Sequence, residues 1–251
     1  MCLIVFAWRP EHALPLVLAA NRDEFHARPS LPLGCWEDAP WIVGGRDLQA
    51  GGTWLGITAR GRFAALTNIR APGQPPGLRS RGELPERYLR GELTPGDYLA
   101  ELAGRCADYA GFNLLVGDHR QLWHLHSHTG EPRPLAPGLY GLSNAGLDTP
   151  WPKLTRARAA LASQLARPDP EHLLELLADT QPAAEHELPR TGVSLEWERR
   201  LSSIFIASPE YGTRASTALI RRADGTLDIL ERSFGPQGPL GEVHYRHPPG
   251  A

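Results

Sequence analysis

Short apolar runs dominate the first third of the chain, and polar or turn-forming residues separate them. Each run has the length of a β-strand and is bounded by Gly, Pro or charged residues, which is typical of strands joined by turns. The pattern predicts strands over Cys2–Trp8, Leu14–Ala20, Trp41–Gly45, Thr53–Ala59 and Phe63–Ile69.

Helical periodicity follows these strands, and strand patterns return later in the chain. Helices are predicted over Gly82–Arg90, Thr94–Tyr109, Trp151–Ala166 and Pro170–Thr180. Further strands are predicted over Asn113–Val116, Gln121–His126, Ala215–Arg221 and Thr226–Arg232, the last two around a turn at Ala223-Asp224-Gly225. Strands, then helices, then strands again indicate a layered α+β fold built on antiparallel sheets.

Two stretches rich in Gly and Pro are the only candidate breaks in this organisation. Ala71–Leu78, APGQPPGL, is the most linker-like, and the tail from Gly235 to Ala251 has a similar composition. Neither divides the chain convincingly, and there is no internal repeat. We therefore expect residues 1–251 to form a single domain.

Composition and charge narrow the class of protein. The 251 residues carry a formal net charge of −2, with 22% charged and 41% hydrophobic residues. These values argue against a disordered chain and against a dedicated nucleic-acid binder, which is usually clearly basic. Lys153 is the only lysine, so the other 25 basic residues are arginines. Such a chain-wide bias suggests codon usage, and it does not by itself indicate an anion-binding site.

The compartment is predicted from what the sequence lacks. No apolar run reaches the roughly 18–20 residues that a membrane-spanning helix needs. The first residues lack the basic start and small-residue cleavage site of a signal peptide. Three cysteines, Cys2, Cys35 and Cys106, are too few and too irregular for a disulfide framework. We expect a cytoplasmic protein with no membrane span.

The first two predicted strands flank a turn at Arg9-Pro10-Glu11-His12 and are expected to pair as an antiparallel hairpin. Pairing about that turn places residue 2 opposite roughly residue 20. Asn21, Arg22 and Asp23 are then expected to emerge beside Cys2. A thiol, a guanidinium and a carboxylate would meet at one end of the hairpin.

Cys2 follows the initiator methionine, which is normally removed before a residue as small as cysteine. Cys2 would then carry a free α-amino group with a pKa of about 7.7–8.0, so one residue would supply both the nucleophile and its base. Arg22 would lower the pKa of the thiol and Asp23 would orient the ammonium. The alternative is a small buried Cys2 with a surface salt bridge between Arg22 and Asp23. The pattern alone leaves both open.

A series of longer motifs adds to this reading of the N-terminus. They are MCLIVFAW, AANRDEF with Asn21-Arg22-Asp23-Glu24, GGTWLGIT (Gly51–Thr58), ALTNIR (Ala65–Arg70), SRGELP (Ser80–Pro85), FNLLVGD (Phe112–Asp118), YGLSNAGLDTPWPK (Tyr140–Lys153) and YGTRASTALI (Tyr211–Ile220). Together they span nearly the whole chain. In these motifs and in their order, the chain resembles the NRDE family, the family of transport and Golgi organization protein 2.

That family is similar in layout to the N-terminal-nucleophile hydrolases, especially the cysteine enzymes that cleave penicillin V and conjugated bile salts. The resemblance implies a four-layer αββα sandwich of two antiparallel sheets. It also implies that two asparagines stabilise an oxyanion and that a late arginine supports the site or contacts substrate. Without it, both asparagines would be interpreted as turn or strand-end caps. The implied site residues are Cys2, Arg22, Asp23, Asn68, Asn144 and Arg214.

The resemblance leaves two functions for the same pocket. As an enzyme, the protein would hydrolyse a carbon–nitrogen amide bond, or a thioester, of a small acyl substrate, and hydrolysis would require no cofactor. As a non-catalytic carrier, it would bind haem or an acyl ligand such as acyl-CoA. A third possibility is an interaction module in membrane traffic, for which the sequence offers no surface motif. No nucleic-acid partner is expected, and the sequence does not indicate an oligomeric state.

Histidines and tryptophans offer weaker candidates. His124, His126 and His128 alternate, a spacing that on a strand suits a metal ion. Because no second cluster of ligands accompanies them, we interpret them as polar residues on the solvent face of an edge strand and predict no metal site. Four tryptophans gather in the N-terminal quarter, where core packing is favoured over the wall of an apolar pocket. They are Trp8, Trp36, Trp41 and Trp54.

Overall fold

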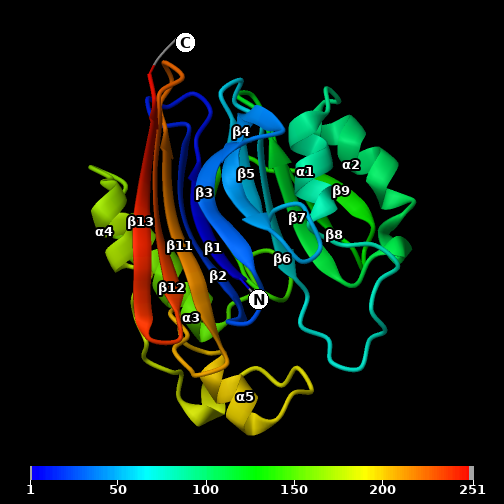
Figure 1. The fold of residues 1–251 in the computed structure, drawn as a ribbon, viewed down its shortest axis with the longest axis vertical. Coiled ribbons are helices and arrows are strands. Elements are labelled where there is room, and N and C mark those ends of the chain that lie inside the picture. The colour runs from blue at the N-terminus through cyan, green and yellow to red at the C-terminus, as the bar shows by residue number, and fades with distance from the viewer. Residues whose placement is uncertain (1, 249–251) are drawn as a thin grey trace.

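The computed structural model describes residues 2–248 and shows two antiparallel β-sheets stacked face to face (Figure 1). Helices cover the outer face of each sheet, which gives four layers in the order αββα. The predicted sandwich of two antiparallel sheets is therefore confirmed.

The first sheet has six strands and contains the N-terminal hairpin at its centre. Its strands lie in the order β10 (Gly138–Leu142), β1 (Cys2–Trp8), β2 (Leu16–Phe25), β11 (Tyr211–Arg221), β12 (Leu227–Gly235) and β13 (Gly238–His247). All neighbouring pairs are antiparallel. Because β1 and β2 have hydrogen-bonded neighbours on both sides and packed layers on both faces, they are apolar over most of their length.

The second sheet has seven strands. They lie in the order β3 (Ser30–Trp36), β4 (Ala39–Asp47), β5 (Leu55–Thr58), β6 (Phe63–Asn68), β7 (Phe112–Gly117), β8 (Leu122–His126) and β9 (Glu131–Pro134). Each strand pairs with the next one along the chain, so the sheet is a meander. Residues 69–111, between β6 and β7, form a long excursion that carries the first two helices.

Four helices form the outer layers. The helices α1 (Glu83–Arg90) and α2 (Pro95–Ala103) pack on the seven-stranded sheet, and α3 (Pro152–Gln164) and α4 (Pro170–Glu175) pack on the six-stranded sheet. A shorter helix, α5 (Leu195–Arg200), precedes β11. Single 3₁₀ turns occur at Cys106–Asp108 and Glu185–Glu187. Among residues 2–248, no helix is long and apolar enough to cross a membrane.

Side chains of β1 alternate between two hydrophobic cores, because successive residues of a strand point to opposite faces of the sheet. Ile4 and Phe6 pack between the two sheets, whereas Leu3 and Val5 pack against α3 and α4. Burying each such side chain contributes about 1.5–3 kcal/mol. Cys2 shares the inward face with Ile4, so the same alternation directs its thiol between the sheets.

The register of the hairpin differs from the prediction by two residues. Cys2 pairs with Arg22, and Ala20 pairs with Ile4. The connection is longer than a four-residue turn, since Arg9 donates its backbone N–H to the carbonyl of Pro15. In consequence β2 continues beyond residue 20 as far as Phe25, and Asn21, Arg22 and Asp23 lie within the strand.

The strands that the sequence pattern missed are the four edge strands. They are β3, β9, β10 and β13. Edge strands tolerate proline and polar residues because one side of the backbone has no partner; Pro32 lies in β3 and Pro132 lies in β9. Most of the Gly- and Pro-rich tail thus forms a strand, β13. The predicted helix over 94–109 ends earlier, at Ala103 before Gly104, and α5 was not predicted.

Candidate functional site

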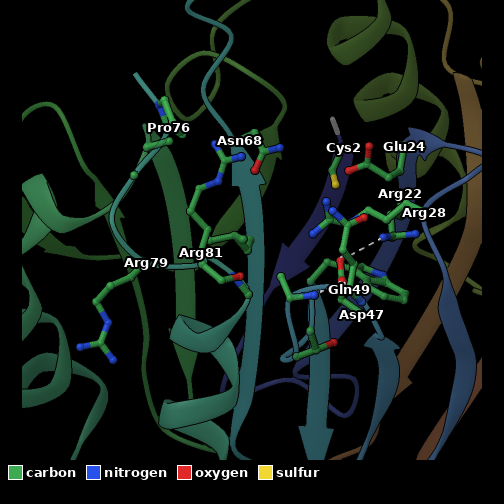
Figure 2. Close-up of a pocket in the computed structure, with 18 of the residues that line it drawn as sticks. Cys2, Arg22, Glu24, Arg28, Asp47, Gln49, Asn68, Pro76, Arg79 and Arg81 are labelled. Carbon is green, nitrogen blue, oxygen red and sulfur yellow. Dashed lines mark hydrogen bonds and ion pairs between the residues drawn. The ribbon is translucent and has the colours of Figure 1, made fainter. Parts of the chain in front are cut away.

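An open cavity of about 410 Å³, here called the site cavity, lies where several strand ends meet (Figure 2). One side, the strand wall, consists of Cys2 from β1, Arg22 and Asp23 from β2, and Asn68 from β6. The opposite side, the loop wall, is the segment Pro76–Gly82 that precedes α1. Four of the six residues proposed from the sequence therefore line one cavity.

Cys2 is at the beginning of β1, and only 9% of its surface is exposed. Burial raises the pKa of its thiol, and the charge of Asp23 acts in the same direction. The charge of Arg22 and the backbone N–H of Asp23 lower it. The predicted influence of Arg22 on the thiol thus has the expected sign, but burial is the larger effect. Met1, whose removal the N-terminal amine would require, lies outside the described residues.

Arg22 is held in the strand wall by three contacts. Its guanidinium lies 4.2 Å from the centre of the Trp54 ring, its Nη1 donates to Ser30 Oγ at 3.4 Å, and its Nη2 is 3.6 Å from Asp47. Arg22 is 6% exposed. The alternative of a surface salt bridge between Arg22 and Asp23 is wrong, because both side chains are buried and neighbouring strand residues point to opposite faces. Trp54 therefore lines the site cavity in addition to packing against the core, which was the role favoured from the sequence.

Asp23 lies on the face of β2 that meets the helical layer, and its Oδ1 accepts a hydrogen bond from Thr213 Oγ1 at 2.8 Å. Burial raises the pKa of this carboxyl, and the charge of Lys153 is the largest opposing influence. Lys153, from the first turn of α3, is 1% exposed. Its burial lowers its pKa to about 8, an effect that Asp23 opposes.

Lys153 was missed by the sequence reasoning. The available signal was compositional, since it is the only lysine beside 25 arginines. A buried amine tolerates loss of its proton, whereas guanidinium stays charged. Lys153 can thus lose or gain a proton in response to the charges of the site, which an arginine at this position could not do.

Asn68 and Asn144 come from distant segments and are joined in the structure. The side chain of Asn144 donates from Nδ2 to the backbone carbonyl of Asn68 at 2.8 Å. Ser143 Oγ donates to the carbonyl of Cys2 at 3.2 Å and so ties this segment to β1. Asn68 lines the site cavity, whereas Asn144 is buried behind it and is not among the lining residues.

A buried ion pair supports this part of the strand wall. Arg70 Nη1 lies 2.7 Å from Glu198 Oε2, with side chains that are 4% and 5% exposed. Glu198 also accepts two hydrogen bonds from Thr191, and the backbone N–H of Arg70 donates to the carbonyl of Asn144. The partners are 128 positions apart, so no local sequence pattern could reveal the pair.

Arg214 lies at an irregular position of β11, where the register with β2 shifts. Its Nη1 donates to the carbonyls of Phe25, His26 and Arg28, and its Nε donates to that of Phe234. It borders a second cavity of about 250 Å³ and does not line the site cavity. The side chain of Arg214 thus holds the end of β2 by binding the backbone carbonyls there.

The segment interpreted as most linker-like, Ala71–Leu78, instead folds back and contributes to the loop wall. The backbone of Gly77 packs closely on the residues just before β7. A Cβ on Gly77 would lie 2.3 Å from the backbone nitrogen of Ala110. One residue beyond the segment, Arg79 donates its N–H to the carbonyl of Asp108 at 3.0 Å. Proline and glycine here shape a wall of the cavity.

The histidine interpretation needs correction. His124 is buried in β8, an inner strand, and its Nε2 lies 3.1 Å from Asn113 Oδ1. Burial lowers the pKa of His124 to about 4. His126 is partly buried and its ring packs edge-on against His128. Within the described range, no group of three or more His, Cys, Asp or Glu side chains could hold a metal ion.

Comparison with known families and relatives gives consistent results. The model of a family described as Transport and Golgi organisation 2 matches residues 1–236. The Transport and Golgi organization 2 homolog of Mus musculus is 34% identical over 257 residues, covering 93% of each chain. The corresponding protein of Homo sapiens is 35% identical with the same coverage. That of Drosophila melanogaster is 26% identical and covers 98% of this chain and 97% of its own.

Two solved structures are similar in fold. The C2A mutant of a conjugated bile acid hydrolase from Clostridium perfringens matches with a TM-score of 0.51 at 6% identity, covering 99% of this chain and 97% of its own. A Caenorhabditis elegans ortholog of N-acylethanolamine-hydrolyzing acid amidase matches with a TM-score of 0.50 at 10% identity, covering 87% and 92%. At these identities the likeness concerns the fold alone.

Proposed function

The chain belongs to the Transport and Golgi organisation 2 family, and from that premise and its fold we propose that it hydrolyses a carbon–nitrogen amide bond of a small acyl substrate. The observation that carries the proposal is the convergence of Cys2, Arg22, Asp23 and Asn68 on one open cavity. A buried structural cysteine would not need a cavity of about 410 Å³ beside it.

Cys2 is the nucleophile of the proposed reaction. After removal of Met1, the α-amine accepts the thiol proton and the sulfur attacks the acyl carbon. The carbon–nitrogen bond of the substrate then breaks. The amine of the substrate leaves with the proton that the α-amine had accepted, and the acyl group remains on Cys2 as a thioester. Water attacks the thioester, which releases the acid and restores the thiol. Asp23 holds the amine in place, and Arg22 favours the thiolate.

Asn68 is the proposed side-chain donor to the oxyanion, since it lines the site cavity beside Cys2. A fixed amide donor stabilises the tetrahedral intermediate without reorganisation during the reaction. Asn144 and Ser143 fix the position of Asn68 relative to Cys2 through their hydrogen bonds to the two backbones. In this proposal Asn144 acts as a positioning residue and Arg214 acts on the end of β2.

Turnover of a panel of N-acyl amides by the wild-type protein and by Cys2→Ala tests the proposal. We expect wild-type turnover and a loss of about 10³-fold or more in Cys2→Ala. Thermal unfolding should stay close to wild type in Cys2→Ala, because a small side chain replaces a small side chain. Equal turnover by both proteins would reject Cys2 as nucleophile.

Two further readouts separate this function from carriage of a ligand. Intact mass shows whether Met1 is absent, and its retention would reject the amine as base. Titration with haem and with acyl-CoA tests the carrier function. Stoichiometric binding that Cys2→Ala leaves unchanged, together with no amide turnover, would replace the enzyme by a non-catalytic carrier.

A further inference from the structure

Four arginines line the site cavity, and three of them already have carboxylate partners. Arg28 lies 2.6 Å and Arg22 lies 3.6 Å from Asp47. Arg79 lies 2.6 Å from Glu83 at the beginning of α1. Each of these three guanidinium groups thus has a carboxylate beside it, although Arg22 and Arg28 share that of Asp47.

Arg81 is different. Its Nη1 donates one hydrogen bond, to the carbonyl of Gly111 at 3.0 Å. Among residues 2–248, no Asp or Glu oxygen lies within 4.0 Å of its guanidinium. Burial lowers the pKa of Arg81, and Glu24 is the largest charge acting against this shift. The guanidinium nevertheless stays protonated at neutral pH and keeps free N–H donors.

The position of Arg81 relative to the reactive groups is visible in Figure 2. Its side chain reaches toward Asn68, while the side chain of Arg79 points away from Cys2. Arg81 and Cys2 both line the site cavity and are close enough to influence each other electrostatically. The unmatched charge of the loop wall therefore faces the strand wall across the space that a substrate would fill.

The loop wall also holds Arg81 in a fixed place. The next residue, Gly82, accepts a hydrogen bond from the backbone N–H of Thr53 at 3.0 Å. Gly52 has a φ of 76°, a backbone conformation that glycine adopts much more easily than other residues. A Cβ at this position would lie 2.2 Å from the carbonyl oxygen of Gly82. A guanidinium on a segment packed this closely is preorganised for a ligand.

We propose that Arg81 binds an oxyanion of the substrate, a carboxylate or a phosphate, beside the bond that Cys2 attacks. The substrate class is thus an anionic acyl amide, and Arg81 is its specificity-determining residue. A planar guanidinium presents paired donors that match either oxyanion. This inference rests on the proposed function for the reaction, but the anion site itself can be tested without turnover.

Two alkylating reagents of almost equal size test the site. Iodoacetate is an anion and iodoacetamide is neutral, and both transfer their carbon to a thiolate sulfur with loss of iodide. Peptide mass spectrometry measures the rate of Cys2 alkylation by each reagent. The ratio of the iodoacetate rate to the iodoacetamide rate cancels any change in the intrinsic reactivity of the thiol. In Arg81→Gln we expect this ratio to fall about tenfold relative to wild type, the worth of one charge-assisted hydrogen bond.

Matched controls accompany this variant. Arg81→Lys keeps the charge and should recover most of the ratio. Arg133→Gln removes an exposed arginine that pairs with Glu131 and does not line the site cavity, and it should leave the ratio unchanged. Cys35 is exposed, so its ratio in the same samples should be equal in all variants. An Arg81→Gln ratio at Cys2 equal to that of wild type would overturn the proposal, whatever the protein does to amides.

Protection of Cys2 from iodoacetamide then identifies the oxyanion. The probes are N-hexanoylglycine, O-phospho-N-hexanoylethanolamine and the neutral N-hexanoylethanolamine, which share one acyl chain. Stronger protection by the carboxylate or the phosphate probe, lost in Arg81→Gln, supports the proposal and selects the group. Equal protection by the neutral probe contradicts it. A failure of amide turnover with an intact Arg81 effect would reject the proposed reaction alone.

Discussion

The two walls of the site cavity are built in different ways. The strand wall, with Cys2, Arg22, Asp23 and Asn68, comes from strand ends whose side chains are mostly buried and whose charges have partners inside the protein. The loop wall, Pro76–Gly82, is packed through its backbone and presents Arg81, which has no carboxylate oxygen within 4.0 Å in the described part of the chain. This difference suggests a division of labour, in which the strand wall performs chemistry and the loop wall recognises the substrate.

The largest effect on stability is expected at the ion pair behind the strand wall. Glu198→Ala removes the carboxylate from a buried guanidinium, and we expect a loss of about 3–5 kcal/mol in the free energy of unfolding. Urea denaturation measures this loss. Glu196→Ala on the same helix removes a partner of Arg200 that is mostly exposed and should cost at most about 1 kcal/mol. Equal losses would show that the strand wall does not depend on this pair.

Asn68 should affect the chemical step more than binding. Asn68→Ala removes the proposed oxyanion donor, and we expect kcat to fall about 10²–10³-fold with a much smaller change in KM. Gln49→Ala, an exposed amide that also lines the site cavity, serves as the control and should keep wild-type kcat. A change in KM alone for Asn68→Ala would move this residue from chemistry to recognition.

Lys153 should give the strand wall a distinctive dependence on pH. Its pKa of about 8 in the folded protein is below its ordinary value of 10.5, so the folded state binds fewer protons between these values than the unfolded state. The cost of burying the ammonium is fully present below about pH 8 and is lost as pH rises to about 10.5. Relative to Lys153→Met, the wild type should gain up to about 3 kcal/mol across this window.

Denaturation series of the two proteins at matched pH values measure this gain. The absence of any other lysine removes one source of interference, and groups that do not interact with Lys153 cancel in the difference. Parallel stability curves from pH 7 to 10.5 would show that Lys153 has an ordinary pKa and that the strand wall is less enclosed than described.

The smallest effect is expected from the packing of the loop wall. Gly77→Val places side-chain atoms against the backbone of Ala110 and Tyr109, so the segment that carries Arg81 must shift. We expect the preference of Cys2 for iodoacetate to fall about threefold to tenfold, with an unchanged rate for iodoacetamide. Gly104→Ala, where no atom lies within 4 Å of an added Cβ, should behave as wild type. A fall in the rates of Cys2 alkylation by both iodoacetate and iodoacetamide would mean that a change in the loop wall also alters the reactivity of the strand wall.

The same contrast explains what the sequence could predict. The strand wall follows from alternation and hairpin pairing, which are local, so Cys2, Arg22 and Asp23 were expected to meet even though the register was two residues off. Asn68 and Asn144 depended on the resemblance to a family, because nothing local brings β6 and the segment after β10 together. The αββα sandwich also needed the resemblance, since the pattern alone indicated only antiparallel layers.

The loop wall could not be predicted from composition. Proline and glycine in Ala71–Leu78 indicate only that the segment is neither helix nor strand, and its close packing depends on contacts with residues near 110. Arg81 lies in the SRGELP motif, but nothing in the sequence separates it from the other 24 arginines as a ligand-binding residue. Its role depends on which arginines have carboxylate partners, which is a property of the folded chain. The burial of Lys153 beside Asp23 and the ion pair of Arg70 with Glu198 could not be predicted for the same reason, because they depend on contacts between distant parts of the chain.

The central claim is that the sulfur of Cys2 becomes acylated during cleavage of an amide. Mass spectrometry of the wild-type protein, quenched in acid during reaction with 5-(hexanoylamino)-2-nitrobenzoate, an anilide that carries a carboxylate, tests this most directly. The account predicts a peptide that begins at Cys2, lacks Met1 and carries one hexanoyl group on sulfur, released again when the quench is delayed. Release of 5-amino-2-nitrobenzoate with no acyl group on that peptide at any time would contradict it.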